Sequence, residues 1–300
     1  MGDGALDRDA RIKLSIGTKQ EGDTDGQFYY PSGLAFDHHR GLLFISDTNN
    51  HRVQVFSCDD GGSFVSKFGE QGDQPGQFLY PWGLAIDHDH DRILIVDSAN
   101  NRVQSWSLSE QSFLSAVGQY GAGDLEFFDP RRIAIDRDHH RIIIVDAGNH
   151  RLVFLSLIDL SFLFEFGSYG KQPGKMCNPG GVCIVNQGRI IVADFYSSRL
   201  QAFTHEGHHI SSFQAEMPWE VAFDEHRGLI AFSAENRVHV IGANQWLAGT
   251  FIWRPDRHRY APSWMKQAIS TMTIIRSLVD ESSSMSMIPN ELLFEIFSHL

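Results

Sequence analysis

Short apolar runs separated by turn residues recur along most of the chain. In the first stretch, four runs rich in β-branched, aromatic or leucine residues cover residues 33–37, 42–46, 52–56 and 64–68. Runs of this length and composition, bounded by Gly, Pro, Asn and Asp, predict β-strands. The second run is almost continuously apolar, which predicts a strand buried on both faces, whereas the third alternates between apolar and polar positions.

This four-run unit is repeated. It begins as GQFYYPSGLAFD at residue 26 and as GQFLYPWGLAID at residue 76, with further copies from residues 126 and 175 and a degenerate fifth from residue 216. A period of roughly 40 to 50 residues with several short strands is typical of a β-propeller blade. A proline begins each first strand. This strand is predicted to lie at the inner edge of the blade, so the N–H that proline lacks removes no hydrogen bond between strands. These prolines are Pro31, Pro81, Pro130, Pro179 and Pro218.

The repeated elements P-x-G-L-A-x-D and I-x-D-x-x-N-x-R-V resemble NHL repeats over roughly residues 20–245, with Asn49 to Arg52 and Asn149 to Leu152 at the tripeptide that names the family. The resemblance implies an all-β, NHL-type β-propeller of about six blades that serves as a binding platform. Five repeats are visible. Residues 11–16 resemble an outer strand that would pair with the last blade, so we expect five blades closed by that strand, with six as the alternative.

The pattern divides the chain into four parts. Residues 1–251 form the predicted NHL-repeat β-propeller, and residues 252–279 carry a helical apolar stripe that predicts a helical extension. Residues 280–287 are a Ser-rich linker. Residues 288–300 place their apolar side chains on one helical face, which completes a short α-helical tail.

The final segment, IPNELLFEIFSHL, resembles the first helix of an F-box and covers only the start of that motif. The resemblance implies a contact with a ubiquitin-ligase adaptor, which would make the chain a substrate-recognition component in ubiquitin-dependent protein degradation. A short docking helix is the alternative. The matching residues of this F-box-like helix are Pro289, Glu291, Leu292, Leu293, Ile296 and Phe297.

Composition narrows the classes of partner and location. The chain has 300 residues and a net charge of −12, and this acidic balance disfavours nucleic acid as the main partner. The N-terminus lacks the basic and apolar regions of a signal peptide, and no apolar run reaches the roughly 18 residues of a membrane span. We therefore expect a cytoplasmic protein, with the nucleus as the alternative. The three cysteines show no CxxC spacing, so neither a disulfide framework nor a cysteine zinc site is indicated.

An acidic and a basic residue recur five positions apart in four repeats. We interpret each pair as structural, because a role in every blade is rarely catalytic. The aspartate is expected to accept N–H groups of the turn, and the arginine to return to the same carboxylate as a bidentate clamp. The pairs are Asp47/Arg52, Asp97/Arg102, Asp146/Arg151 and Asp194/Arg199.

Histidine-rich turns at residues 87–91 and 136–140 raise the question of a metal. Because packed sheets lie about 10 Å apart, ligands from different blades are not expected to converge on one ion. We therefore predict no metal and no cofactor, although a site within a single turn stays open. No Ser/His/Asp or Cys/His arrangement marks a nucleophile. The propeller is accordingly expected not to be an enzyme, with a metal-dependent lyase, as found among NHL-like propellers, as the alternative.

The repeats differ most next to the first-strand proline, on the connection that reaches the mouth of the channel. Aromatic and arginine side chains on one rim are typical anchors of protein interfaces; wedging between blades is the alternative for the aromatic residues. We therefore predict a protein or peptide partner on this rim, and RNA as a weaker alternative. The predicted rim residues are Tyr30, Tyr80, Trp82, Arg131, Arg132 and Trp219, of which Trp82, Arg131 and Trp219 are expected to be exposed.

Overall fold

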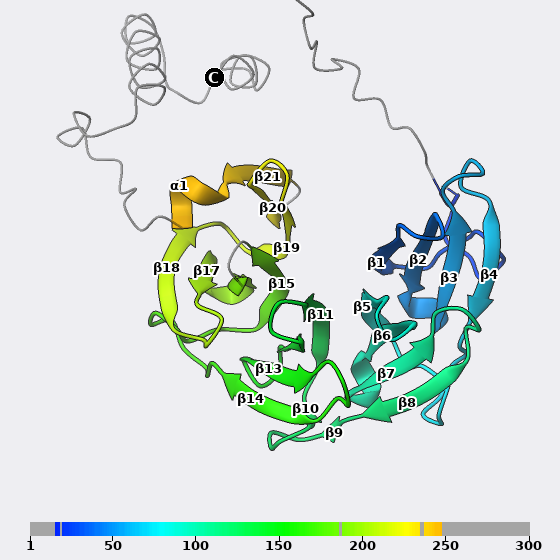
Figure 1. Ribbon diagram of the computed structural model, residues 1–300, viewed down its shortest axis with the longest axis horizontal. Coiled ribbons are helices and arrows are strands. Elements are labelled where there is room, and N and C mark those ends of the chain that lie inside the picture. Colours follow the sequence, from blue (N-terminus) through cyan, green and yellow to red (C-terminus); the bar gives the residue numbers. More distant parts are fainter. Residues whose placement is uncertain (1–15, 19, 186–187, 235–236, 248–300) are drawn as a thin grey trace, which may run out of the picture. The chain divides into compact units, whose positions relative to one another are not determined.

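A computed structural model describes residues 16–18, 20–185, 188–234 and 237–247, which fold into five antiparallel sheets, here called blades 1 to 5. Figure 1 shows the blades in chain order, with the first strand of each blade on the inner side. Successive inner strands contact one another in the order β1, β5, β11, β15, β19. The all-β propeller arrangement predicted from the repeats is therefore confirmed. None of the described helices is long and apolar enough to cross a membrane.

The first three blades each contain four strands paired in chain order. Blade 1 consists of β1 (Pro31–Asp37), β2 (Leu42–Asp47), β3 (Arg52–Ser57) and β4 (Phe64–Phe68). Blade 2 consists of β5 (Pro81–Asp87), β6 (Arg92–Asp97), β7 (Arg102–Ser107) and β8 (Phe113–Val117). Blade 3 consists of β11 (Pro130–Asp136), β12 (Arg141–Asp146), β13 (Arg151–Ser156) and β14 (Phe162–Phe166).

Blade 4 also has four strands, whereas blade 5 has three among the described residues. Blade 4 consists of β15 (Pro179–Val185), β16 (Arg189–Asp194), β17 (Arg199–Phe203) and β18 (His209–Gln214). Blade 5 consists of β19 (Pro218–Asp224), β20 (Leu229–Ala234) and β21 (Arg237–Gly242), followed by α1 (Ala243–Leu247). The connections hold a parallel pair, β9 (Gln119–Tyr120) with β10 (Glu126–Phe127), and the 3-10 turns η1 (Thr48–Asn50), η2 (Ser98–Asn100) and η4 (Phe195–Ser197).

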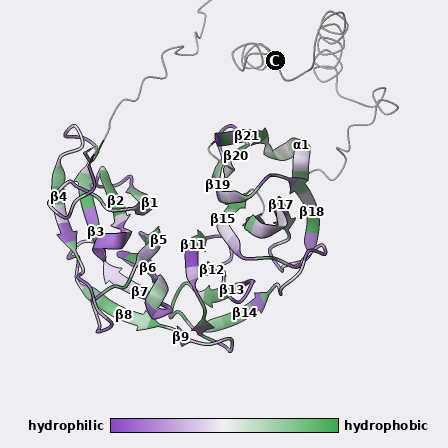
Figure 2. Ribbon diagram, turned by 180° about the vertical axis from the view of Figure 1, so that it is seen from behind, coloured by the Kyte–Doolittle hydropathy of each residue, from purple (hydrophilic) through white to green (hydrophobic). Residues whose placement is uncertain are grey.

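The hydrophobic core lies between consecutive blades. All six residues of β6 and of β12 are buried, as expected for second strands packed on both faces. Figure 2 shows hydrophobic positions, in green, recurring along the strands of the blades. Phe44 and Val55 of blade 1, for example, share one buried cluster with Ile93 and Ile95 of blade 2. Each blade is therefore stabilised mainly by its neighbours, because a single sheet of this size cannot bury both of its faces alone.

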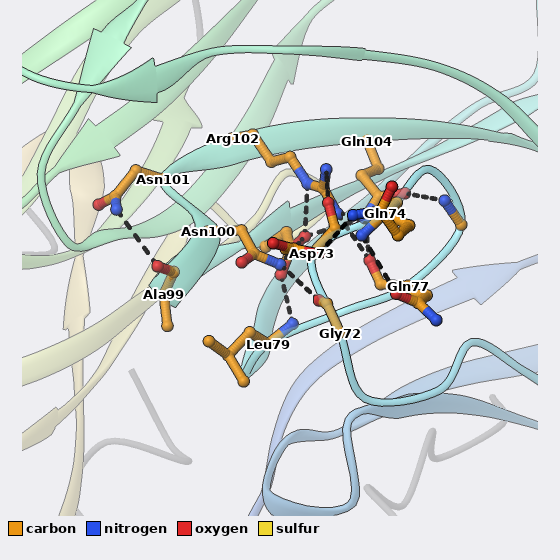
Figure 3. A network of polar contacts seen from close by, with 12 residues as sticks. Gly72, Asp73, Gln74, Gln77, Leu79, Ala99, Asn100, Asn101, Arg102 and Gln104 are labelled. Carbon is orange, nitrogen blue, oxygen red and sulfur yellow. Dashed lines mark hydrogen bonds and ion pairs between the residues drawn. The ribbon is translucent and has the colours of Figure 1, made fainter.

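The repeated aspartate and arginine are structural, as predicted. In blade 2 the fully buried Asp97 accepts the N–H of Leu79 at 2.7 Å through Oδ1. Its Oδ2 accepts Arg102 Nε at 2.7 Å and the amide groups of Asn100 and Gln104, each at 2.9 Å (Figure 3). A buried carboxylate is thus neutralised and hydrogen-bonded on both oxygens, which is what its burial requires.

The geometry of the clamp differs from the expected bidentate pair. Only Nε of Arg102 bonds the carboxylate, while its two terminal nitrogens donate to the carbonyl oxygens of Asp73, Gln74 and Gln77 at 2.8 to 3.0 Å (Figure 3). These carbonyls belong to the segment that arrives from blade 1. Because the guanidinium fork has five N–H donors, it serves two partners at once. The clamp therefore fixes the connection between blades as well as the turn within a blade.

Blade 5 lacks this clamp. Pro218 pairs with Ala234, as Pro31 of blade 1 pairs with Asp47, so alanine occupies the aspartate position. Ser233, one residue earlier, corresponds to Ser46, and each serine hydroxyl accepts a backbone N–H of its own inner strand. The degenerate fifth repeat thus keeps the serine contact and loses the buried ion pair.

Several predictions concern segments outside the described residues. The outer strand expected at residues 11–16 lies there except for Ile16, which is not part of a strand in the structure. The helical extension at 252–279, the linker at 280–287 and the F-box-like helix at 288–300 also lie outside the described residues. These three assignments stay predictions from the sequence.

Candidate functional site

A backbone irregularity at the start of every inner strand positions the candidate site. The residue before each inner-strand proline has a positive φ, between 45° and 60°. In the first four blades the pairing of the first two strands then shifts between the proline and the third residue after it. A β-bulge of this kind redirects the side chains next to it. The bulged residues, Ser32, Trp82, Arg131, Gly180 and Trp219, are the positions at which the repeats differ.

Three of the predicted rim residues from three different blades form one cluster. The indole rings of Trp82 and Trp219 lie 6.1 Å apart, centroid to centroid. The guanidinium carbon of Arg131 lies 5.1 Å from the ring centre of Trp219 and 5.9 Å from that of Trp82. Arginine placed over tryptophan at this distance is held by a cation–π interaction.

Further side chains extend the cluster and orient its arginine. Arg131 donates one hydrogen bond to Asn178 Oδ1 at 2.7 Å and one to Asp129 Oδ2 at 2.6 Å. Tyr30 meets Trp82 edge to face at a centroid distance of 6.4 Å, and Phe195 of η4 meets Trp219 in the same way at 5.1 Å. Trp82, Arg131 and Trp219 are half-buried rather than exposed as predicted, because their side chains pack on one another across neighbouring blades. Their role in binding a partner stays a prediction.

Polar atoms in this cluster have no protein partner. Nε1 of Trp82 and Nε of Arg131 are buried and make no hydrogen bond within the described part of the chain. Buried polar groups are almost always hydrogen-bonded, and an unpaired one costs about 1 to 3 kcal/mol. Both N–H groups therefore lie inside the cluster, and the surface that the cluster presents to a partner consists of the exposed parts of its rings and of the Arg131 guanidinium.

A charged pair lies beside the cluster on the inner strands. Arg132 forms an ion pair with Glu220 of blade 5 and donates a hydrogen bond to the backbone carbonyl of Ser32 at 3.1 Å. Burial raises the pKa of Glu220, and the neighbouring Arg132 opposes this effect by favouring the carboxylate. The pair connects the inner strands of blades 1, 3 and 5.

Glu220 and Phe195 were not among the predicted site residues. Glu220 occupies the repeat position that holds Gly33, Gly83 and Gly181 in blades 1, 2 and 4. The sequence shows this replacement of a repeated glycine by a charged residue. Blade 3, which has Arg132 at the same position, is the other repeat that shows it. Phe195 begins a 3-10 turn outside the strand pattern, so its approach to Trp219 could not be read from the repeat.

Tyr80, in contrast, belongs to a separate contact. Its ring packs against His51 at a centroid distance of 4.7 Å, and its backbone N–H donates to His51 Nδ1 at 3.1 Å. We therefore define the rim cluster as Tyr30, Trp82, Arg131 and Trp219, with Arg132 next to it. Tyr80 serves below as a matched residue outside the cluster.

The expectation that ligands from different blades do not converge is wrong for one pair of turns. Asp37 and His39 of blade 1 and His88 of blade 2 place one potential ligand atom each within 4.8 Å of one another. The imidazole rings of His39 and His88 pack against each other, with their centroids 4.2 Å apart and their planes tilted by 32°. The side chains that extend from the two turns together span the roughly 10 Å between packed sheets. The prediction considered the spacing of the backbones alone.

The three cysteines are free thiols, as expected. Burial raises the pKa of the Cys58, Cys177 and Cys183 thiols. A thiol with a raised pKa is mostly protonated at neutral pH and is a poor nucleophile. None of the three is therefore suited to covalent catalysis.

Comparisons with known proteins agree with this architecture. The family described as 6-bladed beta-propeller matches residues 34–116, and the NHL repeat family matches residues 176–203. Comparison with curated protein sequences gives no significant match.

Solved structures share the fold at low sequence identity. A protein chain in the crystal structure of a nidogen/laminin complex is 16% identical with a TM-score of 0.59, covering 75% of this chain and 79% of that chain. A protein of unknown function from Desulfotomaculum acetoxidans is 16% identical with a TM-score of 0.57, covering 75% and 69%. A catalytically inactive virginiamycin B lyase from Staphylococcus aureus with quinupristin is 12% identical with a TM-score of 0.51, covering 75% and 72%.

These neighbours have different functions, so the likeness establishes the fold alone. The five sheets and the repeat pattern together identify the chain as a β-propeller, in which residues 176–203 match the NHL repeat.

Proposed function

We propose that this propeller is a non-enzymatic interaction module that binds a protein or peptide partner on the rim cluster. The observation that carries the proposal is the placement of Arg131 over Trp82 and Trp219, three side chains from three blades that meet on one rim. Tryptophan, tyrosine and arginine are the residues enriched at the energetic centres of protein interfaces.

The local charges support a peptide over a nucleic acid. Arg131 and Arg132 are paired with Asp129 and Glu220, respectively, so the cluster has no surplus of positive charge. RNA-binding surfaces depend on such a surplus together with stacking aromatics. A peptide needs only apolar or aromatic side chains to pack on the aromatic faces of the cluster.

Affinity purification of the full chain with quantitative mass spectrometry tests this proposal. Trp219→Ala and Tyr30→Ala remove members of the rim cluster, and Tyr30 is 59% exposed, so its loss leaves the fold intact. Tyr80→Ala is the matched control. Partners that are lost with both cluster variants and retained with Tyr80→Ala support the proposal. An unchanged partner set, or equal loss in all three variants at unchanged melting temperature, contradicts it.

A role in ubiquitin-dependent degradation rests on the sequence resemblance of residues 288–300 alone. A chain that ends at residue 280 separates the ubiquitin-ligase role from partner binding on the rim cluster, because it lacks residues 288–300 and keeps the whole propeller. Ubiquitin-ligase components that co-purify only with the full chain would support this role. Their absence from both purifications would contradict it and would leave the rim proposal unaffected.

A further inference from the structure

The turns that join the first two strands of blades 1 and 2 bring three potential metal ligands together. Asp37 ends β1, His39 follows in the same turn, and His88 lies in the corresponding turn of blade 2. Asp37 is fully buried, and its Oδ1 lies 3.8 Å from Nδ1 of His88. The potential ligand atoms of all three residues lie within 4.8 Å of one another.

The backbone fixes the carboxylate for this geometry. Oδ1 of Asp37 accepts the N–H groups of His39 at 3.0 Å and of Arg40 at 3.2 Å. Hydrogen bonds to a ligating carboxylate orient it in metal sites. The ring of His39 packs against that of His88, whereas His90 of blade 2 uses Nδ1 to contact the aspartate of its own turn, at 2.8 Å.

We propose that Asp37, His39 and His88 bind one divalent cation of the zinc type and thereby connect blade 1 to blade 2. Two imidazoles and one carboxylate suit Zn²⁺, Co²⁺, Ni²⁺ or Cu²⁺ and are a poor set for Mg²⁺ or Ca²⁺, which prefer oxygen ligands. Bonds of about 2.1 Å put the ligand atoms of a tetrahedral site about 3.4 Å apart. The ligand atoms lie within 4.8 Å of one another, so they have to move closer together to bind one ion. Because backbone N–H groups fix Asp37, this movement falls to the imidazole rings of the exposed His39 and the half-buried His88.

The neighbouring charges set the expected strength. Arg40 donates to Asp37 Oδ2 at 3.0 Å and to Asp91 at 2.8 Å, so it occupies the oxygen that does not face His88. Its positive charge opposes a cation, while Asp91 offsets that charge. Arg137 is likewise paired, with Asp89 at 3.3 Å. We therefore expect weaker binding than in a zinc site free of arginine, and tighter binding in Arg40→Gln.

The turn that joins the first two strands of blade 3 offers a control. Its His139 stacks on His205 from the β17–β18 turn of blade 4, with centroids 4.6 Å apart. There, however, Nδ1 of His139 already contacts Asp136 at 2.9 Å, and Arg141 binds the same carboxylate. His139→Ala therefore removes a histidine from the same kind of turn without touching the proposed site.

Calorimetric titration of the chelator-treated full chain with ZnCl₂ tests the proposal. We expect one site that His88→Ala and His39→Ala each weaken at least tenfold, that His139→Ala leaves unchanged, and that MgCl₂ does not fill. Titration with Co²⁺ should give visible absorption that the His88→Ala variant lacks. Equal weakening by His139→Ala, or unchanged affinity in His88→Ala at an unchanged melting temperature, would overturn the assignment and mark the binding as adventitious.

Discussion

At the scale of single residues, the buried aspartates determine how the blades are held. Asp97 is fully buried, and its two oxygens accept hydrogen bonds from Leu79, Asn100, Arg102 and Gln104. Removing one partner of such a network leaves the other charge and several donors unpaired inside the protein, which costs far more than the net value of the pair.

The first prediction is that Asp97→Ala lowers the free energy of unfolding by about 3 to 5 kcal/mol. Asp89→Ala is the control, because Asp89 is 71% exposed and its ion partner Arg137 is exposed as well, so its loss should cost under about 1 kcal/mol. Urea unfolding followed by circular dichroism measures both. Equal losses for the two variants would refute the structural role assigned to the clamp.

A second residue-scale prediction concerns Asp159 in the turn before β14. Hydrogen bonds from the Ser161 and Ser156 side chains hold the pKa of Asp159 at about 2, below its usual value of 3.8. The folded-state pKa is the lower one, so the stabilisation is present above pH 3.8 and is lost as the pH falls toward 2. Carboxyl NMR titration should show this midpoint, and Ser161→Ala should raise it toward 3.8; a midpoint already near 3.8 in the unchanged protein would contradict the prediction.

At the scale of elements, the inner strands of blades 1 and 2 approach each other closely at Gly33. A Cβ on Gly33 would lie 2.0 Å from the carbonyl oxygen of Trp82 and 2.8 Å from Ser46 Oγ. Ser46 Oγ in turn donates to the same Trp82 carbonyl at 2.7 Å. Glycine at this position therefore permits the close approach of the inner strands of blades 1 and 2 and, with it, the position of Trp82.

We accordingly predict that Gly33→Ala destabilises the fold by about 1 to 3 kcal/mol through overpacking and alters the fluorescence of Trp82. Gly61→Ala is the comparison, because its Cβ meets open space and the cost comes only from its φ of +60°, about 1 kcal/mol. Denaturant unfolding and tryptophan emission are the measurements. If Gly33→Ala proves no worse than Gly61→Ala, the inner strands are not closely packed in solution.

The strands themselves were predictable because turn residues mark every boundary in the repeat. The expected runs at 33–37, 42–46, 52–56 and 64–68 differ from β1 to β4 by at most two residues at either end. The blade-to-blade variation also pointed to Trp82, Arg131 and Trp219, which the structure places in one cluster and whose role in binding stays a prediction. Two contacts were not predictable: the packing of His39 against His88, which depends on side chains from two blades, and the pairing of Arg132 with Glu220. The sequence marks both charged positions of that pair, but their contact depends on the relative position of blades 3 and 5.

At the scale of the whole molecule, the two ends of the series of blades differ from its interior. Leu34 and Phe36 of β1 are 66% and 42% exposed, whereas the corresponding Leu84 and Ile86 of β5 are buried at 7% and 9%. The preceding blade covers the latter pair, and Figure 1 shows β1 at one end of the series. On blade 5, Val238 and Val240 of β21 are exposed at the other end.

This asymmetry predicts unequal effects of the same substitution. Leu84→Ala should lower the free energy of unfolding by about 2 to 5 kcal/mol, because it leaves a cavity between blades 1 and 2. Leu34→Ala, at the equivalent position of blade 1, should change it by no more than about 0.5 kcal/mol. Urea unfolding of the two full-length variants gives the comparison directly. A loss with Leu34→Ala that equals the loss with Leu84→Ala would contradict the exposed state of β1, because an uncovered side chain has no packing to lose.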